Sequence, residues 1–307
     1  MAVVLMSKVE DIADWRRRMA AAAPEIAFRI WPEIGDPAEV RLIAFDTVPD
    51  DFTAPPNLGC LSYLGHGVGS FVDHPRLPRD VPITRLVDPG IIRCMVQLAL
   101  HFVLARRWRA EAYARQQREH RWRKLPLADS TGVRVGVLGL GAIGRRIAEA
   151  LVALEFPVAG WSRGPHEIPG VECHHGASAW PGFLADKDIV VCVLPETRET
   201  RGLIDAAALA AMKPQAYFIN LGRGAVVDEP ALLAALDSGH LAGAALDVFA
   251  TEPLPAESPL WAHPKLTVTP HIGGGAAIGA VEAIVANYRR LLAGEPLEGV
   301  ADRTRGY

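Results

Sequence analysis

The chain has 307 residues, of which 50% are hydrophobic and 22% are charged, and its formal net charge is −3. That much apolar sequence excludes disorder as the default state and suggests about two domains. The weak negative charge gives no basic field for nucleic acid, and no apolar run reaches the roughly 20 residues of a membrane span. Because the start of the chain lacks the features of a signal peptide and no CxxC motif is present, we expect a cytoplasmic protein with reduced thiols.

The first part of the chain alternates strand-like and helix-like segments. An amphipathic pattern predicts a helix over 9–23. Four apolar runs predict strands, at 3–6, 26–31, 41–45 and 58–64. This alternation is typical of a parallel sheet. The stretch 75–89 carries four prolines, so we interpret it as a connection.

A proline-free segment from Gly90 to about Arg123 predicts one long helix or a helix pair. Its first half is apolar, whereas its second half is rich in Arg, Gln and Glu. The part from 100 to 123 is longer than its own domain requires. We therefore expect an arm that packs on a second subunit and makes a homodimer; a solvated helix is the alternative.

A stronger alternating pattern follows the break at 126–132. Helical segments fall between most of its strands, and a final helix is expected over 276–292. The expected strands lie at 133–138, 158–162, 189–194, 216–221, 243–249 and 266–270. Strands that alternate with helices in this way predict an α/β fold with a parallel sheet.

The strand VRVGVL runs into a glycine-rich turn and then into a helix. The turn reads Gly139-Leu140-Gly141-Ala142-Ile143-Gly144. In a strand–turn–helix context such a turn holds the pyrophosphate of a dinucleotide, because glycines allow the tight turn and the close approach of the ligand. The helix N-terminus supplies unpaired N–H groups for the anion. A tight turn without a ligand is the alternative.

The end of the next strand indicates which dinucleotide is bound. NAD-binding domains carry an acidic residue there for the ribose hydroxyls, but this chain has Ser162 followed by Arg163. A hydroxyl and a guanidinium bind a 2′-phosphate, which a carboxylate would repel. We therefore expect a preference for NADP, with NAD also possible. A solvated charge at the strand end is the other interpretation of Arg163.

Three charged residues follow later strands of the same predicted sheet: Arg223, Glu252 and His271. Parallel strands bring them to one edge, beside the glycine turn. A histidine can give a proton to the alkoxide that hydride addition to a ketone produces, and a carboxylate on its far nitrogen fixes the tautomer. An arginine can hold a substrate carboxylate. Each residue alone is more often structural, but the three together predict a catalytic set.

Five segments resemble the D-isomer-specific 2-hydroxyacid dehydrogenase family: GVLGLGAIGRRIAEAL, LPETRETRGLI, INLGRGAVVDEPAL, ALDVFATEPL and TPHIGGG. Other features, among them WSR at 161–163 and the ending RGY, are similar to the glyoxylate/hydroxypyruvate reductase A type. The resemblance implies a Rossmann-type doubly wound sheet, 99–275, inserted into a smaller flavodoxin-like substrate domain, 1–98 and 276–307. It also implies a dimer.

The resemblance also implies roles for individual residues. Arg223 would anchor the substrate, Glu252 would partner the histidine, and His271 would donate the proton. Asp247 would hold the nicotinamide carboxamide, and the rest of the cofactor cleft would be lined by Leu194, Pro195, Leu221, Gly222, Gly273 and Gly274. Backbone amides of a turn in the first domain, at His66, Gly67 and Val68, would bind the substrate carboxylate. A plain loop is the alternative for that turn.

These features predict an NADP-preferring reductase of small 2-keto acids such as glyoxylate or hydroxypyruvate. A non-catalytic dinucleotide sensor or corepressor on the same fold is one alternative, although a sensor has no need of the three charged residues. A formate or phosphite type of dehydrogenase is another, but it favours an acid where Ser162 stands. The triplet Cys173-His174-His175 is interpreted as a surface turn and not as a metal site.

Overall fold

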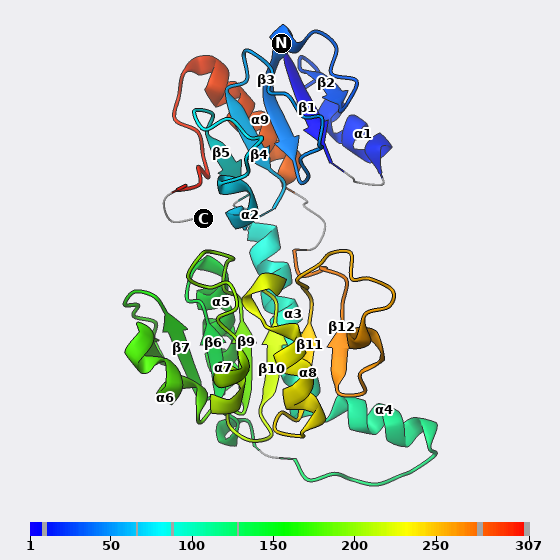
Figure 1. The fold of residues 1–307 in the computed structure, drawn as a ribbon, viewed down its shortest axis with the longest axis vertical. Coiled ribbons are helices and arrows are strands. Elements are labelled where there is room, and N and C mark those ends of the chain that lie inside the picture. The colour runs from blue at the N-terminus through cyan, green and yellow to red at the C-terminus, as the bar shows by residue number, and fades with distance from the viewer. Residues whose placement is uncertain (8–10, 66, 87–88, 128, 275–278, 304–307) are drawn as a thin grey trace. The chain divides into compact units, whose positions relative to one another are not determined.

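The computed structural model of the chain describes all residues except 8–10, 66, 87–88, 128, 275–278 and 304–307. The chain forms two compact units (Figure 1). The first unit is Met1–Ile91 with Gly274–Tyr307, and the second unit is Ile92–Gly273. The boundaries at 91/92 and 273/274 compare with expected ones at 98/99 and 275/276.

The first unit is built on a five-stranded parallel sheet in the order β2-β1-β3-β4-β5. Its strands are β1 Ala2–Met6, β2 Ala27–Ile30, β3 Val40–Phe45, β4 Cys60–Tyr63 and β5 Ile83–Arg85. This order is that of flavodoxin-like sheets. The interpretation of 75–89 as a connection was wrong over three residues, because β5 lies there. Its three residues are too few to give a pattern, and pairing with β4 defines the strand.

In the described part of the first unit, three α-helices lie entirely within it: α1 Ile12–Ala22, α2 Gly69–Val72 and α9 Ala280–Ala293. α9 buries Ala280, Val281, Ile284, Val285 and Tyr288 on one face, as its 3.6-residue period requires. It ends at Gly294, which adopts the left-handed conformation at φ 69°. α1 and α9 contact each other.

The second unit is built on a seven-stranded parallel sheet in the order β12-β11-β10-β9-β6-β7-β8. Its strands are β6 Val135–Leu138, β7 Val158–Ser162, β8 Val171–His175, β9 Ile189–Cys192, β10 Tyr217–Asn220, β11 Gly243–Leu246 and β12 Leu266–Val268. The reversal of order at β6 makes the sheet doubly wound, as expected. The interpretation of 173–175 as a turn was wrong: the sequence VECHH forms the edge strand β8, whose polar composition hides it.

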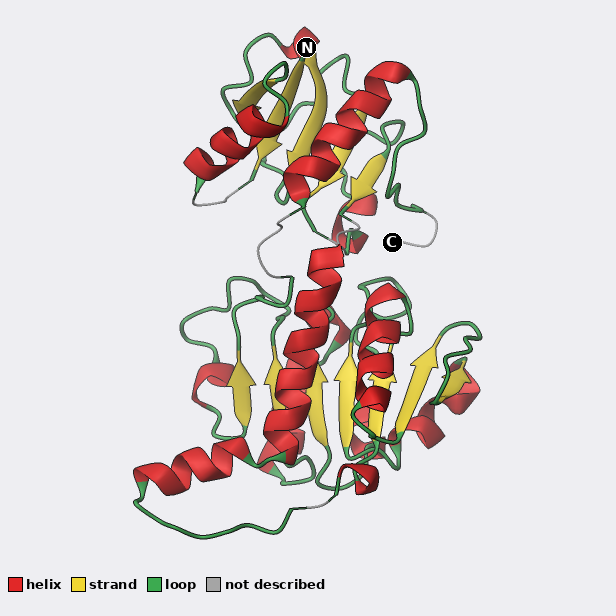
Figure 2. Cartoon of the chain, turned by 180° about the vertical axis from the view of Figure 1, so that it is seen from behind, coloured by secondary structure: helices red, strands yellow, loops and turns green. Residues whose placement is uncertain are grey.

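The helices of the second unit cover both faces of this sheet, with α3 and α5 on one face and α7 and α8 on the other (Figures 1 and 2). They are α3 Pro89–Arg107, α4 Ala110–Arg118, α5 Ala142–Ala153, α6 Trp180–Leu184, α7 Ala206–Ala211 and α8 Glu229–Asp237. The proline-free segment forms a helix pair, interrupted at Arg109, whose φ is 55°. Within the described residues, none of the helices combines the length and the apolar character that crossing a bilayer needs.

Candidate active site

One edge of the second unit's sheet carries both groups of expected site residues. The glycine turn follows β6, and Ser162 is the last residue of β7. The three charged candidates follow the adjacent strands β10, β11 and β12: Arg223, Glu252 and His271. Because all these strands are parallel, their carboxyl ends lie at one edge. The strand order reverses between β9 and β6, where open α/β sheets bind ligands.

The glycine turn has the geometry of a phosphate cradle. Gly139 adopts φ 98°, which favours glycine. A Cβ on Gly144 would lie 1.7 Å from the carbonyl oxygen of Gly139, so β6 and α5 can approach only because Gly144 has no side chain. Gly141 caps α5, and a Cβ there would meet no atom within 4 Å. Ala142 and Ile143 begin the helix and present amides that have no partner inside it, so a pyrophosphate fits here.

The end of β7 has surroundings that the sequence did not indicate. Ser162 is buried, and its hydroxyl donates to the carbonyl oxygen of Gly164 over 2.8 Å. Arg163 is exposed and acts on the carboxylate of Glu199, as does Arg198. The pKa of Glu199 lies below its ordinary value, chiefly because the Thr197 side chain and the backbone donate hydrogen bonds, with the two arginine charges adding to the effect. Arg163 and Arg198 are thus both close enough to Glu199 to lower its pKa.

The loops after β9 and β10 lie against each other. A Cβ on Gly222 would come within 2.5 Å of the carbonyl oxygen of Leu194, so glycine is required for this contact. Leu194 and Leu221 are buried, whereas Pro195 is half-buried. The carbonyl oxygen of Pro195 accepts a 2.6 Å hydrogen bond from Thr200 Oγ1. The structure therefore brings these four expected cleft residues together.

A buried asparagine shapes the turn that presents Arg223. Asn220 ends β10, and its Oδ1 accepts a hydrogen bond of 3.1 Å from the amide of Gly222. Its Nδ2 donates to the carbonyl oxygen of Arg223, also over 3.1 Å. A Cβ on Gly224 would lie 1.8 Å from the carbonyl carbon of Phe249, so glycine allows this turn to pack against the segment leading to Glu252.

His271 and Glu252 form a pair at the same edge. Nδ1 of His271 lies 2.7 Å from Oε2 of Glu252, whose Oε1 accepts a 2.9 Å hydrogen bond from the amide of Phe249. Burial raises the pKa of Glu252, but the hydrogen bonds from His271 and Phe249 and the charges of His271 and Arg223 outweigh it, so this pKa lies below its ordinary value. Glu252 therefore stays ionised and directs the Nδ1 proton, which leaves Nε2 for chemistry.

Asp247 directly follows β11 and is almost fully buried. Its Oδ1 accepts hydrogen bonds from Thr269 Oγ1 at 2.6 Å and from the amide of Ile272 at 2.9 Å. Its Oδ2 accepts one from the amide of Gly273 at 2.8 Å. A carboxylate has about four acceptor positions, and these three donors fill three of them. Gly274 is the first residue of the chain's return to the first unit.

The expected substrate turn belongs to the first unit. His66 lies outside the described residues. The side chain of Val68 is fully buried, so only its backbone amide is available to a ligand, and Gly67 is half-buried. Val68 caps the four-residue helix α2 without any side-chain hydrogen bond.

The profile of the D-isomer specific 2-hydroxyacid dehydrogenase NAD binding domain matches residues 99–273, more than half of the chain. This chain belongs to the D-isomer specific 2-hydroxyacid dehydrogenase family. The resemblance stated from the sequence is thereby confirmed. The matched range contains the glycine turn, Arg223, Glu252 and His271.

Full-length relatives in the family are reductases by name. The chain is 37% identical to the glyoxylate/hydroxypyruvate reductase A of Photorhabdus laumondii, over all of both chains, and 38% identical to that of Serratia proteamaculans, over 96% of each. A 2-hydroxyacid dehydrogenase from Xanthobacter autotrophicus, solved with NADPH and MES, is 45% identical with a TM-score of 0.92 over 100% of this chain and 99% of its own. An NADPH-dependent glyoxylate/hydroxypyruvate reductase from Sinorhizobium meliloti, solved with NADP and sulfate, is 33% identical with a TM-score of 0.93 over all of both chains.

Several polar residues of the site were missed from the sequence. Asn220, Glu229 and Thr269 each hold a site loop, and Glu229 does so by accepting a 2.7 Å hydrogen bond from the amide of Ala250. A weak signal existed, because Asn220 interrupts an apolar strand and Glu229 stands in the segment VVDEPAL. The partners of Glu229 and Thr269 lie on other loops, which the sequence does not reveal, whereas Asn220 bonds within its own turn.

Proposed function

We propose that this chain is an NADPH-dependent reductase that converts small 2-keto acids, such as glyoxylate and hydroxypyruvate, to 2-hydroxy acids. The observation that carries the proposal is the 2.7 Å contact between His271 Nδ1 and Glu252 Oε2 at the sheet edge that also holds the glycine turn. The reductase names of full-length relatives support the substrate class.

Each catalytic candidate has a distinct role in this reduction. When bound, the reduced nicotinamide supplies the hydride that adds to the keto carbon. His271 donates a proton from Nε2 to the oxygen that becomes the hydroxyl, while Glu252 stabilises the charged imidazole and fixes the ring. Arg223 holds the substrate carboxylate and its carbonyl oxygen by charge-assisted hydrogen bonds. Asp247 orients the carboxamide, while the amides of Ile272 and Gly273 hold its carboxylate in place.

The first unit is proposed to be the substrate domain. The amides of Gly67 and Val68 are our candidates for binding the substrate carboxylate, because successive backbone N–H groups in a turn attract anions. The parallel sheet of this unit, in its flavodoxin-like order, is consistent with a ligand-binding role.

The proposed preference for NADPH over NADH rests on Ser162 and Arg163, with Arg198 as a second nearby cation. Two relatives whose structures contain NADPH or NADP support it. Replacing Arg163 with Ala should weaken NADPH binding by about 1.5–3 kcal/mol, the range for hydrogen bonds to charged groups. NADH binding should stay nearly unchanged, and equal losses for both cofactors would assign Arg163 to folding.

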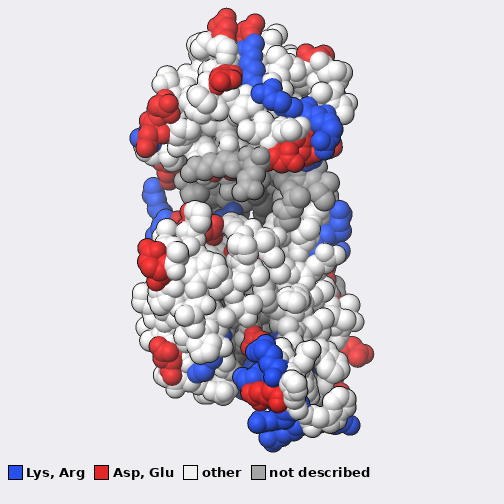
Figure 3. Space-filling view, turned by 90° about the vertical axis from the view of Figure 1, so that its right-hand side faces the viewer, with Lys and Arg blue, Asp and Glu red and all other residues white. Residues whose placement is uncertain are grey.

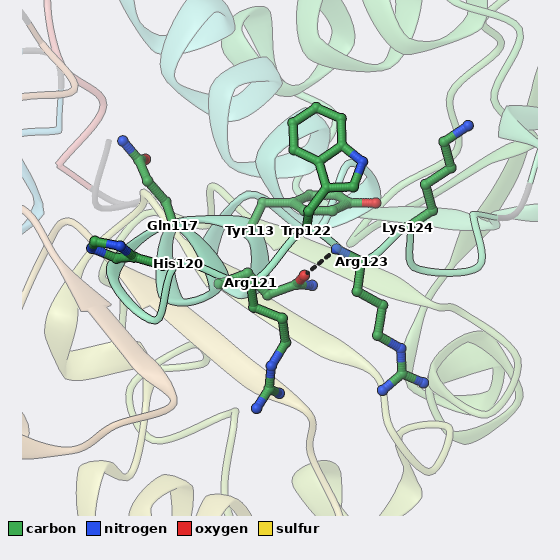
Figure 4. A pocket seen from close by; sticks show the side chains of 8 residues that line it. Tyr113, Gln117, His120, Arg121, Trp122, Arg123 and Lys124 are labelled. Carbon is green, nitrogen blue, oxygen red and sulfur yellow. Dashed lines mark hydrogen bonds between the residues drawn. The ribbon is translucent and has the colours of Figure 1, made fainter.

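The expected arm, 100–123, spans the end of α3, α4 and the residues that follow α4. The part of it proposed to join two subunits in a homodimer is α4 with the loop after it, Ala110 to Leu127, which is called the arm below. The loop lies over the helix, because Arg123 N donates to Gln116 Oε1 over 3.1 Å (Figure 4). Leu125 N also donates to Tyr113 Oη, over 3.0 Å. A cavity of about 460 Å³ lies between the loop and the helix. Trp122 is 97% exposed, and basic side chains gather around the arm (Figure 3).

An exposed tryptophan on such an arm fits a protein interface, because large rings contribute much of the binding energy there. The root of the arm is fixed to the second unit, since Oε1 of Glu111 accepts a 3.1 Å hydrogen bond from Thr267 Oγ1. From this contact the arm extends beyond the sheet of the second unit (Figure 1). A cytoplasmic location is also part of the proposal, and the four free thiols support it.

A spectrophotometric assay tests the function directly. NADPH oxidation is followed with glyoxylate, hydroxypyruvate, pyruvate, phenylpyruvate and longer 2-keto acids, and then with NADH. Formate and phosphite with NAD serve as substrates of the competing dehydrogenase class. Turnover of a small keto acid with NADPH supports the proposal, whereas dinucleotide binding without turnover of any substrate would instead indicate a sensor.

A further inference from the structure

The turn that carries His271 has a backbone conformation that needs support. His271 adopts φ 53°, in the left-handed region that residues with a side chain seldom adopt. Such a conformation persists only where the surroundings hold it in place. The amide of His271 donates to the carbonyl oxygens of Asp247 at 2.9 Å and Thr269 at 3.0 Å, which ties the turn to the end of β11.

A single carboxylate holds this turn on both sides of the histidine. Asp247 accepts hydrogen bonds from Thr269, two residues before His271, and from Ile272 and Gly273, which follow it. Only the donor from Thr269 is a side chain. The packing around the carboxylate is close, because a Cβ on Gly273 would lie 2.8 Å from Asp247 Oδ2.

We propose that Thr269 is a positioning residue for proton donation. Its hydroxyl holds the Asp247 carboxylate in the orientation that supports the His271 turn, so that the imidazole stays on Glu252 with Nε2 in one place. This inference rests on the proposed function, because it assigns Thr269 a part in that reduction. Thr269 touches neither the imidazole nor a reacting atom, and it acts through Asp247.

The short distance explains why this hydroxyl matters. An O–H donor to an ionised carboxylate forms a shorter and stronger hydrogen bond than a neutral pair, and 2.6 Å is in that range. Asp247 is 1% exposed, so water cannot easily replace a lost donor. Without the hydroxyl, Oδ1 keeps only the amide of Ile272, and the carboxylate can rotate. The turn then loses part of the support for the conformation of His271.

Two substitutions separate the hydroxyl from the shape of the side chain. Thr269→Val keeps the branched shape and removes the hydrogen bond, whereas Thr269→Ser keeps the hydroxyl and removes a methyl group. With NADPH and the keto acid that the wild-type enzyme reduces best, we expect Thr269→Val to lower kcat by about tenfold relative to wild type. The solvent deuterium isotope effect on kcat should rise, because proton donation becomes slower. Thr269→Ser should restore both values to nearly wild type.

The controls show whether each variant is folded. Melting temperature and NADPH affinity are measured for both, and Thr269→Ala provides a second variant without the hydroxyl that should behave like Thr269→Val. An unchanged kcat and isotope effect in the variants without the hydroxyl overturns the inference while leaving the proposed function intact. Equal losses in the Val and Ser variants also overturn it. A wild-type enzyme that reduces no keto acid contradicts the proposed function, and the inference with it.

Discussion

The side chains of the candidate site differ in exposure, and their proposed roles differ accordingly. His271 is 44% exposed and so can reach a ligand, whereas Asp247 is 1% exposed and is satisfied by protein donors. Glu252 lies between these extremes and bonds both the histidine and the backbone. The exposed group is thus the one to which we assign proton transfer, and the buried groups fix its position.

Replacing His271 with Ala should lower turnover by at least about 10²-fold, because general acid catalysis contributes about that much or more. NADPH binding should persist, since the glycine turn and Arg163 belong to other strand ends. Steady-state kinetics measures the loss of turnover, and fluorescence titration with NADPH measures cofactor binding. An unchanged kcat would remove His271 from the mechanism. Arg223→Ala serves as a comparison and should mainly raise KM for the keto acid.

The Glu252 carboxylate predicts a pH effect on stability. Its pKa is depressed in the folded protein from a reference value of 4.5, so its contribution is present above about pH 4.5 and is lost as pH falls through the folded pKa. The melting temperature of the wild type should therefore exceed that of Glu252→Gln near neutral pH, and the gap should shrink below pH 4.5. Scanning calorimetry across this range is the measurement. A constant gap would contradict the assignment.

At the scale of elements, the site depends on how closely loops approach at the carboxyl ends of the strands. Three glycines mark these approaches: Gly144 beside Gly139, Gly222 beside Leu194, and Gly224 beside Phe249. At each of them a Cβ would come within 2.5 Å of backbone atoms. Such a clash cannot be removed by the movement of a flexible side chain. Gly222 and Gly224 let loops of different strands pack together, whereas Gly144 lets α5 approach the turn that follows β6.

The glycine turn offers a matched pair of substitutions. Gly144→Ala should cost at least about 2–3 kcal/mol of unfolding free energy, because its Cβ would collide with the turn. Gly141→Ala should leave stability nearly unchanged, since its Cβ meets nothing within 4 Å, but the methyl group would occupy the space of a pyrophosphate. We expect a tenfold or larger loss of NADPH affinity, about 1.4 kcal/mol. Calorimetry and NADPH titration separate the two effects, and unchanged NADPH affinity in Gly141→Ala would contradict the cradle.

At the scale of the whole molecule, the chain forms two units that each have their own parallel sheet and core. The second unit contains every expected catalytic residue and all the expected cofactor residues except Gly274. The NAD binding domain of the family matches residues 99–273, which lie within the second unit.

The proposed homodimer predicts a mass about twice the 33.1 kDa of one chain in light scattering at micromolar concentration. Trp122→Asp should place a charge in a dry interface and release the monomer. Trp261→Asp is the control, because Trp261 is also exposed, at 51%, but lies outside the arm. A monomeric wild type would leave the arm without an assigned role.

Much of the site could be predicted from the sequence because its signals are local. The glycine spacing at 139–144, the residues Ser162 and Arg163 at a strand end, and the charged residues after three later strands each occupy one short segment. Parallel strands then bring those segments to one edge, since every carboxyl end points the same way. Apolar runs likewise predicted ten of the strands approximately, and most of these strands are buried; β2 and β12 are only partly buried.

The polar groups that hold the site in place can be identified only from the folded chain. β5 and β8 are defined by pairing with β4 and β7, since neither has a strong pattern of its own. The bonds of Asn220 to the Arg223 turn, and of Thr269 to Asp247, require exact placement of groups that periodicity does not describe. Composition and spacing determine which residues reach an edge, because they act along the chain. Hydrogen bonds and close contacts between loops determine how those residues are oriented, because they form only when the chain has folded.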